Sequence, residues 1–302
     1  MIPHQAFIKP QDRNSDCMLL LRPGQRLLLL VCVMLFCWVV SNVFNGLILA
    51  KFGISTRTLR VAAVIQSMVQ IILPAIVTAM MVSRKPACLL AIERPPRSGV
   101  LLLGVCTLIV SVPLLNLVIH LNAMMQLPAA MAGVEQWLRH MEDSAGSTIA
   151  TLQGGTSVAD LVMSVLIVGI MAGLGEELLF RGTIQRLLST GGLNPHAAVW
   201  ITAALFSAVH MQFFGFVPRL LLGALFGYML YWSGTLWLPV CVHAANNIIY
   251  VSTHWMAMRS AVSSTTVDTV GTDGSWPIIL TSALLTTATL TALYHKCRRK
   301  RT

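Results

Sequence analysis

The chain has 302 residues, of which 56% are hydrophobic and 11% are charged. Soluble domains average about 45–50% apolar and about 25% charged residues, so this composition excludes an ordinary soluble protein and predicts a membrane protein. The formal net charge of +10 could suit a nucleic acid, but the basic residues stand at the ends of apolar segments rather than on a folded basic face. We therefore expect contacts with membrane lipids and no nucleic-acid partner.

Apolar segments close to the roughly 20 residues that span a bilayer recur along the whole chain. They predict eight transmembrane helices, at about 27–50, 60–83, 99–121, 161–188, 196–213, 216–233, 235–253 and 276–295. The first segment is longer than a signal-peptide core of about 7–15 residues, and no small-residue cleavage site follows it, so we expect it to be retained. The expected fold class is all-α, a polytopic transmembrane helix bundle of about eight spans.

An even number of spans places both termini on the same side of the membrane. Basic residues cluster on that side, around 9–26, 84–97 and 296–301, so the positive-inside rule predicts that both termini are cytoplasmic. One loop disagrees, because Lys51, Arg57 and Arg60 would then lie on the outer face. Compact loops and the lack of a recognisable targeting segment lead us to expect a multi-pass protein of a bacterial inner (plasma) membrane.

The seven cysteines are scattered, mostly within apolar segments, and show no CxxC or Cys/His ligand spacing. This pattern favours buried free thiols over disulfides or a zinc knuckle. The residues are Cys17, Cys32, Cys37, Cys88, Cys106, Cys241 and Cys297.

Between the third and fourth predicted spans, apolar residues recur at alternating spacings of four and three. They are Leu127, Met131, Val134, Leu138 and Met141. This period predicts an amphipathic helix over about 127–142, and with Trp137 on it we expect the helix to lie in the membrane interface. A flap or gate over a lateral opening is the alternative.

The stretch at 173–182, GLGEELLFRG, places two acidic residues and an arginine within a predicted span. Charged side chains inside a membrane are costly and usually face the bundle interior, where they pair or do chemistry. Glu177 and Arg181 are four residues apart and can form an ion pair on one helix face. Glu176 is rotated by about 100° and therefore faces a different partner.

Two later predicted spans carry polar residues that could meet Glu176. FSAVH places Phe206 and His210 four residues apart, and HAANN does the same for His243 and Asn247. A carboxylate in apolar surroundings can accept a proton from water, which makes Glu176 a candidate base. His210 could hold that water or pass a proton. His243 and Asn247 could donate hydrogen bonds to an oxyanion.

This set outlines a site for amide hydrolysis, and two other interpretations stay open. Zinc accepts a ligand set such as Glu176, His210 and His243, but the HExxH pattern is absent, so the expected cofactor is either zinc or none. A polar network with a purely structural role is the second interpretation.

Three motifs in order resemble those of the CPBP intramembrane proteases, which include the type II CAAX prenyl proteases and proteins linked to bacteriocin processing and self-immunity. They are EExxxR at Glu176–Arg181, FxxxH at Phe206–His210 and HxxxN at His243–Asn247. The resemblance covers about residues 157–255. It implies a catalytic core at 157–255, and outside this range the chain matches only in being hydrophobic. The apolar segments divide the rest into an N-terminal region of three spans and the amphipathic segment at 1–156, and a last span with a basic cytoplasmic tail at 256–302.

The resemblance also implies a role for each motif residue. Glu176 would activate the water with the help of His210, and His243 and Asn247 would form the oxyanion hole. Supporting roles would fall to Glu177, Arg181 and Phe206. The family is often called a metalloprotease family, although a glutamate-activated water without a metal is also argued for it.

The expected function is that of an intramembrane endopeptidase, a hydrolase that cleaves a peptide bond in a membrane-associated peptide or protein. One alternative is a binding or immunity protein of the same fold that does not cleave its partner, and dependence on Glu176 would separate the two. Another is a proton-coupled transporter that uses the same residues as a relay. The lack of an internal repeat disfavours the transporter.

Overall fold

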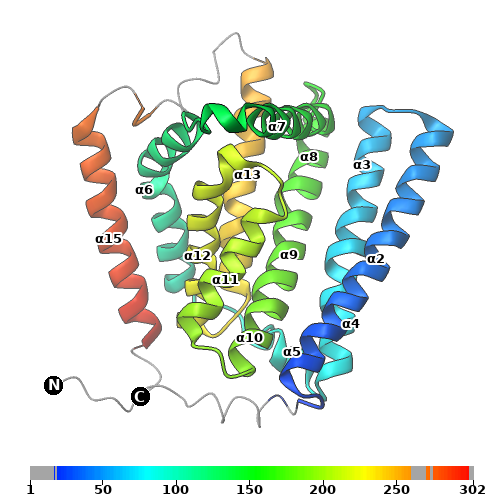
Figure 1. The fold of residues 1–302 in the computed structure, drawn as a ribbon. Coiled ribbons are helices and arrows are strands. Elements are labelled where there is room, and N and C mark those ends of the chain that lie inside the picture. The colour runs from blue at the N-terminus through cyan, green and yellow to red at the C-terminus, as the bar shows by residue number, and fades with distance from the viewer. Residues whose placement is uncertain (1–16, 18, 260–269, 273–274, 299–302) are drawn as a thin grey trace.

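The computed structural model describes residues 17, 19–259, 270–272 and 275–298, and these residues form a bundle of helices (Figure 1). Within the described residues there is no β-strand, only an isolated bridge between Leu19 and Ser83. The expected all-α transmembrane bundle is thereby confirmed. The predicted orientation also drew on residues 9–16 and 299–301, which lie outside the described residues.

Helices form at each of the eight predicted positions. Six are single helices: α2 (Pro23–Phe52), α6 (Ser98–Ala123), α11 (Pro195–Ala208), α12 (Phe216–Ser233), α13 (Trp237–Arg259) and α15 (Trp276–Arg298). The second position is a continuous helix made of α3 (Thr56–Ile65), η1 (Gln66–Ile72) and α4 (Leu73–Val82). The fourth is a continuous helix made of α8 (Val158–Ser164), η3 (Val165–Met171), α9 (Ala172–Glu177), η4 (Leu178–Gln185) and α10 (Arg186–Thr190). Among the described residues, six helices are long and apolar enough to cross a membrane. The two others are α11, which has 14 residues, and α13, whose polar side chains lower its mean hydropathy.

The predicted span at about 196–213 is too long, because α11 ends at Ala208. Met211 has a φ of 53°, a left-handed conformation that is uncommon for a residue other than glycine and that does not continue a helix. The Ser207 hydroxyl donates to the Phe216 carbonyl oxygen over 2.7 Å. The chain therefore turns back at once, through η5 (Phe213–Gly215), into α12.

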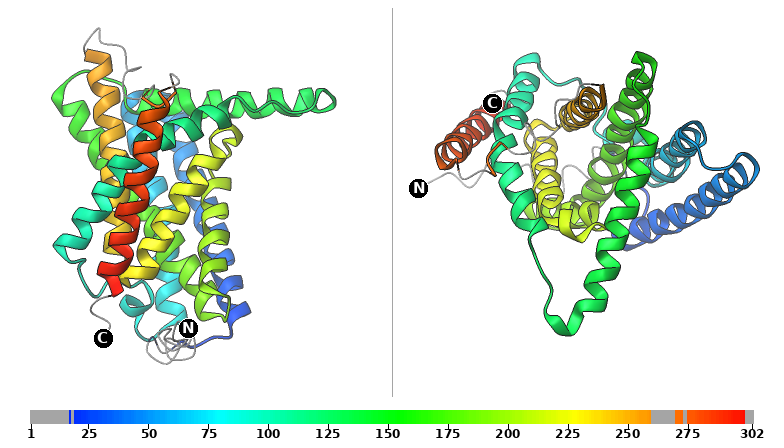
Figure 2. Two further views of the ribbon diagram at one scale, coloured as in Figure 1. Left: turned by 90° about the vertical axis from the view of Figure 1, so that its left-hand side faces the viewer. Right: turned by 90° about the horizontal axis from the view of Figure 1, so that it is seen from above.

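The central group of helices consists of α8–α10, α11, α12 and α13, with α2 and α3–α4 on one side and α6 and α15 on the other (Figures 1 and 2). The start of α2 and the end of α15 lie at the same end of the bundle (Figure 1), as an even number of crossings requires. The cytoplasmic location of that end stays a prediction.

At the opposite end, α7 (Ala132–Leu152) lies across the bundle, nearly perpendicular to the other helices (Figures 1 and 2). None of its residues is buried, as expected of an amphipathic helix on a surface. It differs from the prediction in its bounds, since it continues to Leu152 and begins after Leu127. A short 3₁₀ turn, η2 (Ala129–Met131), precedes it.

Close backbone packing brings α13 against η3 and α9. A Cβ atom added to Gly173 would lie 3.3 Å from the Ala244 amide nitrogen, and one added to Gly169 would lie 2.9 Å from the Ile248 side chain. Small residues four apart let two membrane helices approach this closely. The π-helical segments η3 and η4 flank α9 on both sides, and π-helical turns are frequent at functional sites.

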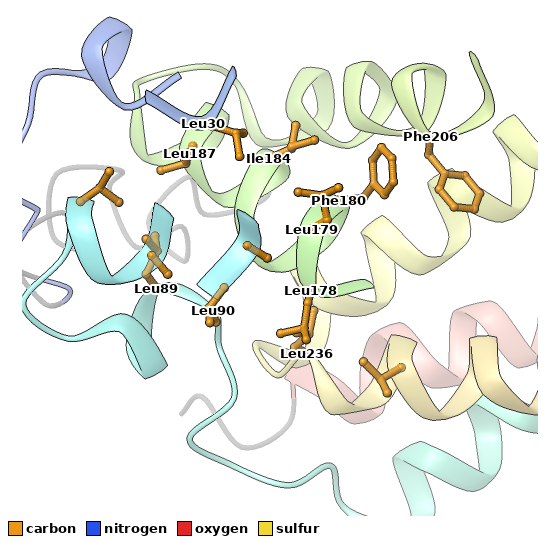
Figure 3. Packing of buried hydrophobic residues seen from close by; sticks show 14 residues of the cluster. Leu30, Leu89, Leu90, Leu178, Leu179, Phe180, Ile184, Leu187, Phe206 and Leu236 are labelled. Carbon is orange, nitrogen blue, oxygen red and sulfur yellow. The ribbon is translucent and has the colours of Figure 1, made fainter. Parts of the chain in front are cut away.

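The largest buried apolar cluster packs η4 against α2, α5 (Pro86–Leu89) and α11. Figure 3 shows Leu178, Leu179, Phe180 and Ile184 of η4 within this cluster, together with Leu30 of α2. Since η4 directly follows α9, the cluster fixes the helix on which Glu176, Glu177 and Arg181 lie.

Cys17 and Cys88 are joined by a disulfide, with their Cα atoms 5.5 Å apart, so the expectation of free thiols is wrong for this pair. The segment before α2 folds against the chain between α4 and α5. There Leu20 N–H donates to the Val82 carbonyl oxygen over 2.9 Å, and the Ser83 hydroxyl donates to the Cys17 carbonyl oxygen over 2.5 Å. These contacts bring together two cysteines separated by 71 positions, which no local spacing can indicate. Cys32, Cys37, Cys106 and Cys241 are free thiols, as expected.

Candidate active site

Glu177 and Arg181 form an ion pair inside the bundle. Arg181 Nη1 donates to Glu177 Oε1 over 2.8 Å, and neither side chain is exposed. Arg181 also donates from Nη2 to the Gly223 carbonyl oxygen over 3.0 Å, and its guanidinium lies 4.4 Å from the centre of the Phe206 ring. The arginine therefore joins η4 to both α11 and α12, beyond the pairing that its spacing from Glu177 predicts.

The same oxygen of Glu177 accepts a second hydrogen bond, from Nδ1 of His243 in α13, over 2.8 Å. The imidazole also stacks on Phe226, with ring centroids 4.7 Å apart, and meets Phe206 edge-on at 6.0 Å. A carboxylate paired with arginine is ionised and only accepts hydrogen bonds, so Nδ1 of His243 carries a proton. Glu177 thus sets both the orientation and the protonated nitrogen of His243.

Glu176 is partly exposed: 19% of its side chain is accessible, whereas that of Glu177 is 0% exposed. Its Oε2 lies 3.7 Å from Nε2 of His243, which is too long for a direct hydrogen bond. The two adjacent acids therefore face opposite edges of one imidazole ring. Their different directions follow from the rotation of about 100° between neighbouring helix residues.

His210 follows the end of α11 and turns its Nδ1 toward the Phe206 carbonyl oxygen, 2.7 Å away. A carbonyl oxygen only accepts, so Nδ1 is the donor and a neutral His210 presents an unprotonated Nε2. The ring meets Phe206 edge-on at 5.0 Å. Phe206 therefore contacts both histidines and holds His210 next to the cluster around Glu177.

Asn247 lies one turn after His243 on α13. Its Nδ2 donates to the Val168 carbonyl oxygen of η3 over 3.2 Å, and its Oδ1 accepts from Asn246 Nδ2 over 3.3 Å. One of the two amide hydrogens of Asn247 is thus committed to the backbone, and the second is available to another acceptor. The structure connects Asn247 to the site through η3 and α13 rather than through a direct contact with an acidic residue.

The alternative of a zinc site depends on how Glu176, His210 and His243 lie relative to one another. Among the described residues, no group of three or more His, Cys, Asp or Glu side chains is placed to hold a metal ion. Glu176, His210 and His243 are thus not gathered as a preformed ligand set, and the use of a metal stays a prediction. Glu177 engages Nδ1 of His243 and the Phe206 carbonyl oxygen engages Nδ1 of His210, so Nε2 is the nitrogen through which each imidazole can meet a metal ion or water.

Sequence patterns miss two features that hold this site together. The contact between His243 and Glu177 joins residues 66 positions apart, and the spacing of residues within one helix gives no sign of it. The turn after His210 is held by α7, because Glu142 Oε2 accepts from Phe214 N–H over 3.2 Å and the Arg139 guanidinium lies 4.0 Å from the Phe214 ring centre. The charged residues on the polar face of α7 were the one sign in the sequence that this helix could contact another part of the chain.

These helices and contacts define a polytopic membrane protein that encloses an ion pair, two histidines and an asparagine within its bundle. Residues 158–249, from α8 into α13, match the model of the type II CAAX prenyl endopeptidase Rce1-like family, so this part of the chain is similar to that family. The matched segment contains all three motifs. Comparison with curated proteins and with solved structures gives no match.

Proposed function

We propose that the protein is an intramembrane endopeptidase in which Glu176 activates water for attack on a peptide carbonyl of a membrane-associated substrate. The observation that carries this proposal is the placement of two adjacent acids on the two nitrogens of His243, with Glu177 at 2.8 Å and Glu176 at 3.7 Å. Glu177 is fully buried and committed to Arg181 and His243. Glu176 is partly exposed, which leaves its carboxylate available as a base.

The reaction requires Glu176 to be ionised at the start. Its carboxylate accepts a proton from water, and the hydroxide attacks the carbonyl carbon while the C=O electron pair moves onto the oxygen. The proton then passes to the amide nitrogen as the C–N bond breaks, which yields a carboxylic acid and an amine. His210 can hold the water through its unprotonated Nε2, because its proton lies on Nδ1.

The oxyanion needs hydrogen-bond donors aimed at the position where charge develops. Since Nδ1 of His243 already donates to Glu177, this residue donates from Nε2 only when it carries both protons. The ionised Glu176 and Glu177 then balance Arg181 and a protonated His243, two negative against two positive charges. Asn247 supplies a second donor through the amide hydrogen that Val168 does not engage.

The test is cleavage of a quenched fluorescent library of membrane peptides by the full-length protein in liposomes. We expect Glu176→Gln to lower the cleavage rate by about 10²- to 10⁴-fold, the usual contribution of a general base, and His243→Ala to lower it similarly. Glu93→Gln is the matched control, because Glu93 is an exposed acid in the loop after α5. A chelator added to each reaction separates metal-assisted activation from activation by Glu176 alone.

Two results would contradict the proposal. Cleavage by Glu176→Gln at the wild-type rate would remove the proposed base. Binding of a library peptide without any cleavage, by a wild-type protein shown to be folded, would favour the binding or immunity protein instead.

A further inference from the structure

A groove of about 700 Å³ lies between α3 and the helix of α8 and η3, apart from the candidate active site. Its walls are apolar over most of their length. Val61, Val64 and Ile65 of α3 line one side, and Met163 and Ile167 line the other. Because both helices belong to membrane-spanning segments, the natural occupant of such a groove is a hydrocarbon chain.

Two arginines line the groove near the start of α3, at the end of the bundle that α7 crosses (Figure 1). Arg60 is held in place, because it donates to Asp160 Oδ1 over 2.9 Å and to the carbonyl oxygens of Leu152 and Gly154 over 3.2 and 3.1 Å. Arg57, one turn earlier, is exposed. It forms no salt bridge with any acidic residue that the structure describes.

The charges at this end of the groove favour an anion. Arg57 and Arg60 contribute two positive charges and Asp160 one negative charge, which leaves a net charge of +1. Asp160 is the only acidic residue among those that line the groove, and Arg60 already engages it. The positive ammonium group of a zwitterionic lipid would therefore find no carboxylate to pair with there.

We propose that this groove binds one anionic phospholipid, with an acyl chain along the apolar walls and the phosphate on Arg57. A guanidinium presents a planar fork of donors that matches the geometry of a phosphate. An apolar channel that ends at a single net positive charge thus complements both parts of one lipid molecule. The site is independent of the proposed peptidase activity.

The lipid site also explains the loop that departs from the positive-inside pattern. Arg60 is neutralised by Asp160 and serves to join α3 to α8. Arg57 gains a local binding partner. Arg57 and Arg60 then have local roles that do not depend on the orientation of the protein in the membrane. Lys51 is the one basic residue of this loop that still departs from the positive-inside rule.

The experiment is native mass spectrometry of the full-length protein released from nanodiscs that contain equal amounts of phosphatidylglycerol and phosphatidylcholine. Wild type should retain phosphatidylglycerol in preference to phosphatidylcholine. Arg57→Gln should lower that retention about fivefold, the effect of one basic residue at an anionic membrane surface. Val64→Trp, which fills the groove, should lower the retention of both lipids.

Arg84→Gln is the matched control, because it removes an exposed arginine at the opposite end of the continuous α3–α4 helix. It should retain lipid as wild type does. Gel filtration and thermal melting establish that each variant is folded, and Arg57→Gln decides the test if Val64→Trp does not fold, since Arg57 is exposed. Equal retention of the two lipids by wild type would overturn the proposal, as would equal retention by the Arg57 and Arg84 variants. A dimer that Val64→Trp dissociates would assign the groove to a second copy of the chain and would overturn it too.

Discussion

One oxygen of Glu177 accepts hydrogen bonds from both His243 and Arg181, each over 2.8 Å. A single buried carboxylate thereby orients the imidazole and neutralises the guanidinium. The neighbouring acid, Glu176, faces Nε2 of the same histidine. The two acids should therefore respond differently to the same substitution.

Glu177→Gln should strongly destabilise the protein. Its removal leaves Arg181 buried without a compensating charge, and breaking a buried pair in this way costs about 3–5 kcal/mol. Chemical unfolding in detergent micelles measures the loss. An unchanged unfolding midpoint would show that the ion pair does not stabilise the fold.

Glu176→Gln should leave stability close to that of wild type while lowering the cleavage rate by about 10²- to 10⁴-fold. Glu176 is partly exposed and forms no ion pair as close as that of Glu177, so the amide replaces the carboxylate with little strain. The same unfolding experiment, run beside the cleavage assay, checks this. Equal destabilisation by both glutamine variants would assign both acids to structure.

Gly173→Val should push α13 away from α9 and lower the cleavage rate, because any Cβ there crowds the Ala244 backbone beside His243. Overpacking of this kind costs about 1–3 kcal/mol. Gly146→Val is the control, since Gly146 lies in α7 with no neighbour within 4 Å of an added Cβ. The prediction fails if both variants cleave peptide at the same rate.

Glu142→Gln should weaken the hold of α7 on the turn after His210, because the neutral amide accepts the Phe214 N–H bond less strongly than a carboxylate does. We expect a cleavage rate several-fold lower, with the thermal melting temperature little changed, since α7 has no buried residue. Asp143→Asn removes a neighbouring exposed charge and serves as the control. Equal cleavage rates for the two variants would show that the contact between α7 and the turn after His210 does not affect activity.

Acidification should loosen the start of α7. The Leu127 N–H bond, followed by the pairing with Arg139, lowers the pKa of Glu135 below its ordinary value. A carboxyl with a lowered pKa in the folded chain stabilises the fold fully above its unfolded pKa, and this contribution is lost as pH falls through the folded value. Amide exchange at residues 127–135, compared between wild type and Glu135→Gln at each pH, should show a difference that disappears in acid. A difference that does not depend on pH would contradict this assignment.

The positions of the helices follow from the sequence because each crossing needs about 20 apolar residues. The end of α11 does not follow from it. Apolar residues continue beyond Ala208, and the turn is set by the left-handed Met211 and by the bond from Ser207 to Phe216. The extension of α7 to Leu152 also depends on tertiary structure, because Arg60 binds the carbonyl oxygen at its end.

The candidate site shows the same division. The ion pair of Glu177 and Arg181 can be predicted because both residues lie on one helix face. The contact of Glu177 with His243 depends on how closely two helices approach at Gly169 and Gly173. The two glycines can be found in the sequence, but the sequence does not indicate that α13 is the helix that packs against them.

The bond between Cys17 and Cys88 bears on the compartment that this end of the bundle faces. Disulfides persist in oxidising compartments and are rare in the cytosol, whereas the positive-inside rule assigns the start of α2 to the cytoplasm. The disulfide therefore indicates an oxidising compartment at this end of the bundle, and the basic residues indicate the cytoplasm. Alkylation of thiols in intact cells, before and after reduction, reads the redox state of this pair, so the chain carries its own reporter of membrane topology.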